Sequence, residues 1–226
     1  MTGHAVPHLL VIGAGPGISA ATARRLGGEG YRVDLIARRE GPLTEVGDAL
    51  RAGGVDVGWA VAEAGDPGSL TAAVELLIAA SGPVDVLLYN VSAGRHAAVP
   101  DLSAEDLLAD LAAGVAGLQA AVRAVLPGMR ERGAGTVLVT GGGAADSPIP
   151  SMASLGVQKA ALRALVEVQA AALAPLGVHV ATATVRGFVG EDRQIHPDRV
   201  ARLYAELVAE TAGPRAMWRT VVDVTA

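Results

Sequence analysis

The chain has 226 residues, enough for one α/β domain with a full hydrophobic core. Its net charge is −5 and its basic residues never adjoin in runs longer than two, so we expect no nucleic-acid partner. Cysteine is absent, which excludes disulfide bonds and thiolate chemistry. No apolar stretch approaches the roughly 18 residues that span a bilayer, and the N-terminus lacks the basic start of a signal peptide. We therefore expect a cytoplasmic protein with no membrane partner.

In chain order, short apolar stretches alternate with Ala- and Leu-rich segments of helical spacing. The expected strands are 8–13, 32–37, 55–62, 84–89, 135–140, 178–184 and 220–224. The expected helices are 19–28, 42–52, 67–80, 103–125, 152–174 and 198–210. Most of the strands are near-continuous in apolar residues, as strands buried on both faces are. The alternation predicts one doubly wound, Rossmann-type α/β domain over residues 1–226, with a seven-stranded parallel sheet flanked by helices.

The first joint between strand and helix is rich in glycine. Gly13, Gly15 and Gly17 lie there, together with Pro16 and Ile18. Glycine allows a tight turn and lets a pyrophosphate approach the backbone N–H groups at the start of a helix. A turn that merely needs a positive φ would also use glycine. The strand, helix and second strand in succession favour a dinucleotide site.

Two adjacent arginines end the second strand. A site for the 2′-hydroxyl of NAD(H) uses an acidic residue at this place, whereas a site for the 2′-phosphate of NADP(H) uses arginine. Arg38 and Arg39 therefore predict NADP(H) rather than NAD(H). Two solvated arginines are the alternative, more so for Arg39 than for Arg38.

Over essentially its whole length the chain resembles the short-chain dehydrogenase/reductase family. Gly13 and Gly17 of "GAGPGIS" match the family's GxxxGxG turn, and Ser19 replaces its last glycine. The resemblance implies an NADP(H) site and an assembly into homodimers or homotetramers through the fourth and fifth helices. The further cofactor-binding residues that it implies are Glu63 and Ala64 after the third strand, Asn90 after the fourth, Lys159, and Gly187 after the sixth.

The family's active site is a Tyr-x-x-x-Lys pair on the fifth helix, supported by a serine and an asparagine. Lys159, the chain's only lysine, matches the lysine. The tyrosine position is then Leu155, the serine position Gly142 and the asparagine position Gly114. Three of the four positions have lost their polar group, as in a divergent bacterial branch that often lacks the tyrosine. By resemblance Lys159 would still hold the ribose of the nicotinamide nucleotide; an exposed lysine without a task is the alternative.

A reductase without the tyrosine needs another proton donor or proceeds more slowly. The candidates are Ser154, near the start of the fifth helix, and His96, whose imidazole is chemically the most able of the candidate groups at neutral pH. Taken singly, each also fits a cap, a turn or a solvated loop. The histidines show no metal-ligand spacing, so we expect no metal.

Two functions follow from these residues. The first is an NADP(H)-dependent oxidoreductase that reduces a small ketone or aldehyde with an atypical active site. The second keeps the fold without redox turnover, as a cyclase, a dehydratase, an isomerase, or an inactive binding or regulatory subunit.

Overall fold

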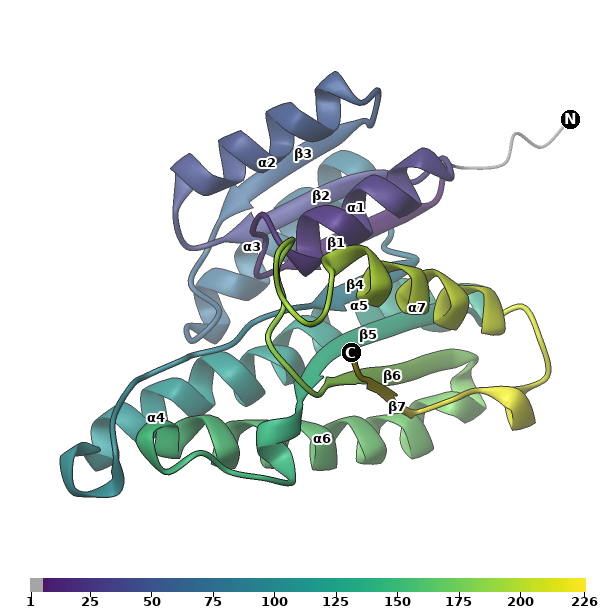
Figure 1. The fold of residues 1–226 in the computed structure, drawn as a ribbon. Coiled ribbons are helices and arrows are strands. Elements are labelled where there is room, and N and C mark those ends of the chain that lie inside the picture. The colour runs from purple at the N-terminus through teal and green to yellow at the C-terminus, as the bar shows by residue number, and fades with distance from the viewer. Residues whose placement is uncertain (1–5) are drawn as a thin grey trace, which may run out of the picture.

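Seven parallel strands form one sheet in the computed structural model, which describes residues 6–226 (Figure 1). Their order is β3-β2-β1-β4-β5-β6-β7. The strands are β1 His8–Ile12, β2 Arg32–Ala37, β3 Val57–Val61, β4 Val86–Tyr89, β5 Gly135–Gly142, β6 Val178–Val185 and β7 Val221–Val224. The helices are α1 Ile18–Gly28, α2 Glu40–Ala52, α3 Pro67–Ser81, α4 Ala104–Leu111, α5 Gly117–Arg132, α6 Ala153–Leu173 and α7 Pro197–Glu210. The predicted doubly wound α/β fold is confirmed, and residues 1–5 of the predicted domain lie outside the described residues.

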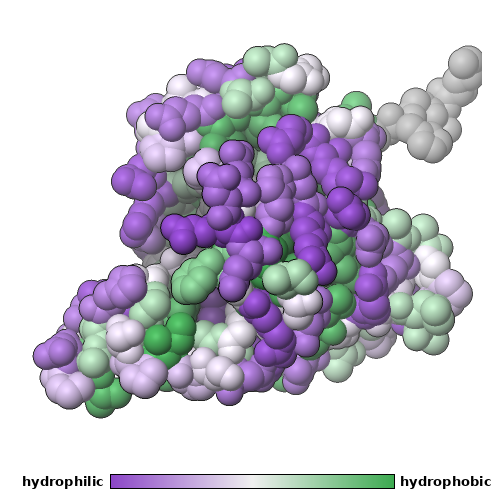
Figure 2. Space-filling view, viewed as in Figure 1, coloured by the Kyte–Doolittle hydropathy of each residue, from purple (hydrophilic) through white to green (hydrophobic). Residues whose placement is uncertain are grey.

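The segment between β4 and α4 extends away from the sheet as an arm, at the lower left of Figure 1. Apolar side chains contact solvent here: Val99 of this arm is 74% exposed, and Leu108 of the adjoining helix α4 is 66% exposed. Figure 2 shows apolar side chains interspersed with polar ones on this arm.

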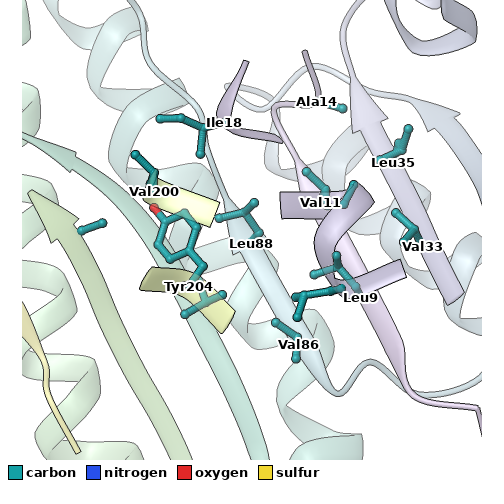
Figure 3. Packing of buried hydrophobic residues seen from close by; sticks show 14 of the residues in the cluster. Leu9, Val11, Ala14, Ile18, Val33, Leu35, Val86, Leu88, Val200 and Tyr204 are labelled. Carbon is teal, nitrogen blue, oxygen red and sulfur yellow. The ribbon is translucent and has the colours of Figure 1, made fainter. Parts of the chain in front are cut away.

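Every central strand packs on both of its faces. Leu9 and Val11 of β1 point into the cluster closed by α1, α2 and α7 (Figure 3). Leu10 and Ile12 point into the opposite cluster, closed by α3, α5 and α6. Because successive side chains of a strand alternate between faces, two apolar faces require a continuous apolar run. The strand sequences therefore carry the information for a three-layer fold.

The single helix expected over residues 103–125 is wrong in two respects. The helical run continues to Arg132 and contains Pro127, and the π-helical turn Ala112–Ala116 interrupts it. Because proline removes one backbone hydrogen bond from a helix, the sequence analysis ended the expected helix before Pro127, which is too early. By length and composition alone, the run 104–132 meets the criterion for a membrane-spanning helix, contrary to the expectation from sequence. In the fold, the side chains of Leu118 and Val122 are buried against the sheet.

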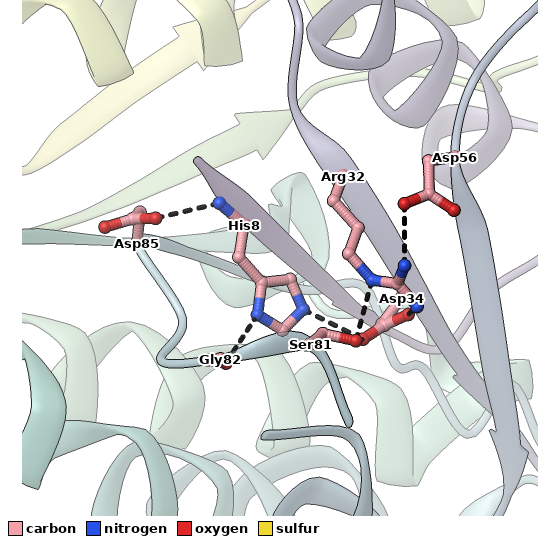
Figure 4. Close-up of polar contacts among 7 residues, drawn as sticks. All are labelled: His8, Arg32, Asp34, Asp56, Ser81, Gly82 and Asp85. Carbon is pink, nitrogen blue, oxygen red and sulfur yellow. Dashed lines mark hydrogen bonds and ion pairs between the residues drawn. The ribbon is translucent and has the colours of Figure 1, made fainter. Parts of the chain in front are cut away.

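A polar cluster joins β1, β2 and α3 away from the carboxyl ends of the strands (Figure 4). The buried carboxylate of Asp34 lies 3.0 Å from Nε2 of His8, and accepts a hydrogen bond of 2.5 Å from Ser81. Arg32 lies 3.5 Å from Asp34 and 2.6 Å from the exposed Asp56. Burial raises the pKa of Asp34, but hydrogen bonds from His8 and Ser81 and attraction from Arg32 outweigh it and hold that pKa below its usual value.

The sign of this shift predicts an acid-sensitive fold. The Asp34 carboxylate contributes stability above its unfolded pKa near 3.8, and this is lost as the pH falls through the lower folded value. As the pH falls below about 4, the unfolding free energy from urea denaturation should decrease more in the wild type than in Asp34→Asn. The additional decrease should total about 1.4 kcal/mol for each unit by which folding lowers the pKa of Asp34. Asp56→Asn, whose side chain is 69% exposed, is the matched control and should retain the wild-type slope. Equal acid slopes in all three proteins would contradict the expectation.

Candidate functional site

A cleft of about 220 Å³ opens at the carboxyl ends of β1, β2, β3 and β4. It lies where the chain reverses its direction across the sheet, since β1 pairs with both β2 and β4, and this is where open α/β sheets bind ligands. Predicted residues from four segments line this cleft: Gly13, Arg38, Arg39, Glu63, Ala64 and Asn90. The fold therefore gathers these six cofactor candidates at one edge.

The glycine-rich turn passes very close to the end of β4. Gly13 has a φ of +84°, and a Cβ there would lie 2.6 Å from the carbonyl oxygen of Asn90. The side-chain amide of Asn90 donates to the hydroxyl of Ser19 at 2.7 Å, and that hydroxyl donates to the carbonyl of Gly13 at 2.9 Å. Ser19 thus ties the turn to β4 by side-chain hydrogen bonds. Gly15, Pro16 and Gly17 lie outside this cleft, with Pro16 exposed.

Arg38 and Arg39 are exposed at the end of β2. Neither guanidinium forms an ion pair or a side-chain hydrogen bond with any of residues 6–226. Two unpaired positive charges beside a cleft are suited to a phosphate, which takes several donors at once.

A second cleft, of about 640 Å³, adjoins the first and shares Asn90 and Ser92 with it. Ile18, Gly142, Leu155, Lys159 and Gly187 are the predicted residues among its lining. The remainder of the lining is largely apolar, with Ile149, Met152, Val185, Phe188 and Val189. An elongated ligand in the first cleft would reach the second at the end of β4.

Lys159 lies inside this second cleft with its side chain only 6% exposed. Its Nζ donates a hydrogen bond of 3.0 Å to the carbonyl oxygen of Thr140 in β5. Burial lowers its pKa to about 8, because the charged form loses water. The interpretation of Lys159 as an exposed helix lysine is therefore wrong. Leu155, one helical turn earlier, lines the same cleft, as the spacing of four predicts.

The two glycines at the predicted serine and asparagine positions have different surroundings. A Cβ at Gly142 would meet Cγ, Cδ and Cε of Lys159 at 3.7–3.8 Å, which is ordinary contact. A Cβ at Gly114 would lie 2.2–2.5 Å from the side chain of Gln158. Gln158 is buried and donates to the backbone carbonyl of Asp110 at 2.8 Å. There is thus room for a small side chain at 142, whereas the Gln158 side chain occupies the place of a side chain at 114.

The two candidate proton donors do not reach the cleft. Ser154 is buried and donates its hydroxyl to Asp110 at 2.7 Å, and Arg95 pairs with the same carboxylate at 3.2 Å. His96 is exposed and lines neither cleft. The hypothesis that either one faces a substrate is therefore wrong for this arrangement. Sequence reasoning missed Asp110, although a lone acid in the apolar run "LLADLAAG" was a visible signal.

Comparison with known proteins agrees with this architecture. The family model described as short chain dehydrogenase matches residues 7–191. A (2S)-[(R)-hydroxy(phenyl)methyl]succinyl-CoA dehydrogenase subunit from Thauera aromatica is 34% identical over 57% of this chain and 51% of its own length. Human dehydrogenase/reductase SDR family member 4 is 28% identical over 76% of this chain and 62% of its own length. The chain thus matches about half to two thirds of these relatives.

Among solved structures, a metagenomic short-chain oxidoreductase in complex with NADP has a TM-score of 0.86 and 25% identity. The likeness covers 98% of this chain and 98% of that one. The family match spans most of the residues and includes both clefts at the sheet edge as far as the loop after β6. This protein therefore belongs to the short-chain dehydrogenase family of oxidoreductases.

Proposed function

We propose that the protein is an NADP(H)-dependent oxidoreductase that reduces a ketone or an aldehyde. One observation carries this proposal: two clefts adjoin at the end of β4, the first beside two unpaired arginines and the second holding a buried lysine. A nicotinamide dinucleotide needs this sequence of groups, with phosphate donors at one end and a ribose donor at the other. The NADP-bound short-chain oxidoreductase of the same fold supports the choice of cofactor.

The residues of this chain would divide the work as follows. The turn at Gly13 leaves space for the pyrophosphate, and Arg38 and Arg39 bind the 2′-phosphate. Lys159 holds the nicotinamide ribose through one of the two N–H groups that Thr140 does not use. When bound, NADPH supplies the hydride for carbonyl reduction. The apolar lining around Leu155 excludes water and fits an apolar carbonyl substrate.

Calorimetric titration with NADPH and NADH tests the cofactor choice. Arg38→Ala should weaken NADPH binding about 10–100-fold, because it removes charge-assisted hydrogen bonds to a phosphate, and should leave NADH binding unchanged. Arg202→Ala, an exposed arginine on α7 that lines neither cleft, is the matched control. Equal affinity of the wild type for the two nucleotides, or an Arg38→Ala variant with unaltered NADPH affinity, would contradict the choice of NADP(H).

A second candidate function follows from Leu155 and Gly142. A leucine and a glycine at the positions where the family has its tyrosine and serine favour an SDR-fold protein without redox turnover: a cyclase, dehydratase, isomerase or regulatory subunit. Oxidation of NADPH in the presence of a panel of apolar ketones and aldehydes separates the two. Tight NADPH binding without oxidation by any carbonyl would favour the second function.

We also propose that the chain forms homodimers or homotetramers through α4, α5 and α6. Leu108 on α4 and Val157 and Val168 on α6 are 49–66% exposed, and a second copy would bury them. Light scattering should therefore give a mass of two or four times 22.7 kDa. Leu108→Glu with Val168→Glu should shift it towards the single-chain mass, because a buried unpaired carboxylate is costly. A wild-type mass of one chain would contradict this assembly.

A further inference from the structure

The amine of Lys159 has hydrogen-bonding capacity that its surroundings do not use. Its stem runs past Gly142, in the space next to the missing side chain, and one N–H bonds the carbonyl of Thr140 at 3.0 Å. An ammonium group has three donors. Within residues 6–226, no second acceptor and no carboxylate pairs with this one. Two N–H bonds are therefore available to a ligand in the second cleft.

The hydroxyl groups that line the same cleft are poor sources of a proton at neutral pH. Ser92 and Ser147 are ordinary alcohols. The hydroxyl of Thr140 shares a hydrogen bond of 2.8 Å with Tyr204 from α7, on the other side of β5. Burial raises the pKa of Tyr204 above its usual value, so this phenol holds its proton more tightly. The hydroxyl groups of Ser92, Thr140 and Ser147 therefore do not replace the absent tyrosine as a proton donor.

Arg186, from the loop after β6, is the other cation in the cleft lining. Its guanidinium pairs with Asp146 at 2.9 Å and with Asp223 at 3.0 Å. The hydrogen bonds that Arg186 donates to Asp223 and Asp146 raise its pKa, and a guanidinium does not deprotonate in proteins. Among the described residues of the lining, Lys159 is therefore the one group that exchanges a proton near neutral pH.

The electrostatics agree with the geometry. Leu155 and Gly142 put no polar atom beside the Lys159 side chain, and desolvation lowers its pKa to about 8. A general acid works best when its pKa is near the working pH. An exposed lysine, with a pKa of about 10.4, would release its proton less readily by more than two orders of magnitude.

We propose that Lys159 is itself the proton donor of the second cleft and protonates the carbonyl oxygen of the substrate. The assignment rests on the proposed reductase function. The carbonyl carbon gains a C–H bond from the hydride of the reduced nicotinamide, and the π pair of the C=O bond moves to oxygen. That oxygen takes a proton from Nζ as one N–H bond breaks. Lys159 is left as a neutral amine and regains its proton from water. In alcohol oxidation the neutral amine accepts the proton instead.

The first test uses the fact that Lys159 is the only lysine of the chain. Protein grown with lysine carrying carbon-13 at Cε, without any lysine in its purification tag, gives one side-chain resonance. We expect this resonance of the free protein to titrate near pH 8. A midpoint above about pH 10, the value of a solvated lysine, would overturn the assignment without any need for turnover.

The second test measures the rate at saturating NADPH across pH. Carbonyl reduction by the wild type should fall about tenfold per pH unit above the pKa of Lys159, whereas alcohol oxidation should rise through the same pKa. Lys159→Arg keeps the positive charge and the donors but cannot release a proton. At saturating NADPH, with the affinity of each protein measured by calorimetry, this variant should reduce substrate about 10²-fold more slowly than the wild type and with no pH dependence in this range.

The outcomes separate the two proposals. A working reductase whose rate ignores pH, or whose Lys159→Arg variant keeps the wild-type rate, would overturn the role of Lys159 alone. A protein that binds NADPH but reduces no carbonyl would overturn the reductase function and the transfer step with it. Opposite pH profiles for reduction and oxidation, both with their midpoint at the pKa read from the lysine resonance, would support both.

Discussion

The double variant Leu155→Tyr with Gly142→Ser should reduce carbonyl substrates about 10²-fold faster than the wild type. Leu155 lies one helical turn before Lys159 and lines the same cleft, so a phenol at this position would have the lysine beside it. A Cβ at Gly142 would have only ordinary contacts of 3.7–3.8 Å, all with Lys159. General acid catalysis contributes about 10²–10⁴-fold, and we expect the lower end because Lys159 already supplies a proton.

Single variants and a binding control make this result interpretable. Leu155→Phe introduces a ring of nearly the size of tyrosine but without a hydroxyl, so it should not raise the reduction rate. The NADPH affinities of the wild type, the double variant and Leu155→Phe should agree within a few-fold. The wild-type pH profile should also change, because a tyrosine beside a lysine would become the titrating donor. A double variant that folds, binds NADPH and gains no rate would mean that the substrate carbonyl does not approach positions 142 and 155.

Gly13→Ala should lower the unfolding free energy by about 3 kcal/mol or more, and should abolish nucleotide binding. The φ of +84° disfavours any residue with a Cβ, and that Cβ would lie 2.6 Å from the backbone oxygen of Asn90. Backbone cannot move aside as a flexible side chain can, so the turn and the end of β4 must separate. The same separation breaks the link from Asn90 through Ser19 to the turn.

Gly15→Ala is the matched control for this prediction. Gly15 lies two residues further along the same turn, and a Cβ there would have no neighbour within 4 Å. Urea denaturation should show a change of less than about 1 kcal/mol for Gly15→Ala, and calorimetry should show retained NADPH binding. If both alanine variants bound NADPH like the wild type, the close approach of Gly13 to β4 would have no role in the site.

The fold was largely predictable because its information is local. Each buried strand has a continuous apolar run such as "LLVI", and turn residues separate the runs from helical segments. The helical run through α4 and α5 shows where local reasoning fails. Pro127 predicts a break in isolation, but burial of Val125 and Met129 on either side keeps the helix continuous through it.

The site was predictable only where a motif fixes it. Gly13 and Arg38 follow from the order of the first strand, helix and second strand, and Lys159 follows from the family resemblance; all three line the two clefts. The contacts of Lys159 with Thr140, and of both Ser154 and Gln158 with Asp110, join residues 19–48 positions apart. No periodicity in the sequence encodes such pairings. The candidate donors Ser154 and His96 therefore had the right chemistry but the wrong surroundings.

The position of Gln158 also couples any substitution of Gly114 to the residue at 158. Asparagine at 114 would place its Cβ 2.2–2.5 Å from the Gln158 side chain, in a part of the core that has no space to give. A polar residue at 114 therefore requires the Gln158 side chain to move away or to be replaced by a smaller one. A side chain at 142 would meet only ordinary contacts of 3.7–3.8 Å. Position 142 can therefore be exchanged by itself, whereas an exchange at 114 also involves position 158.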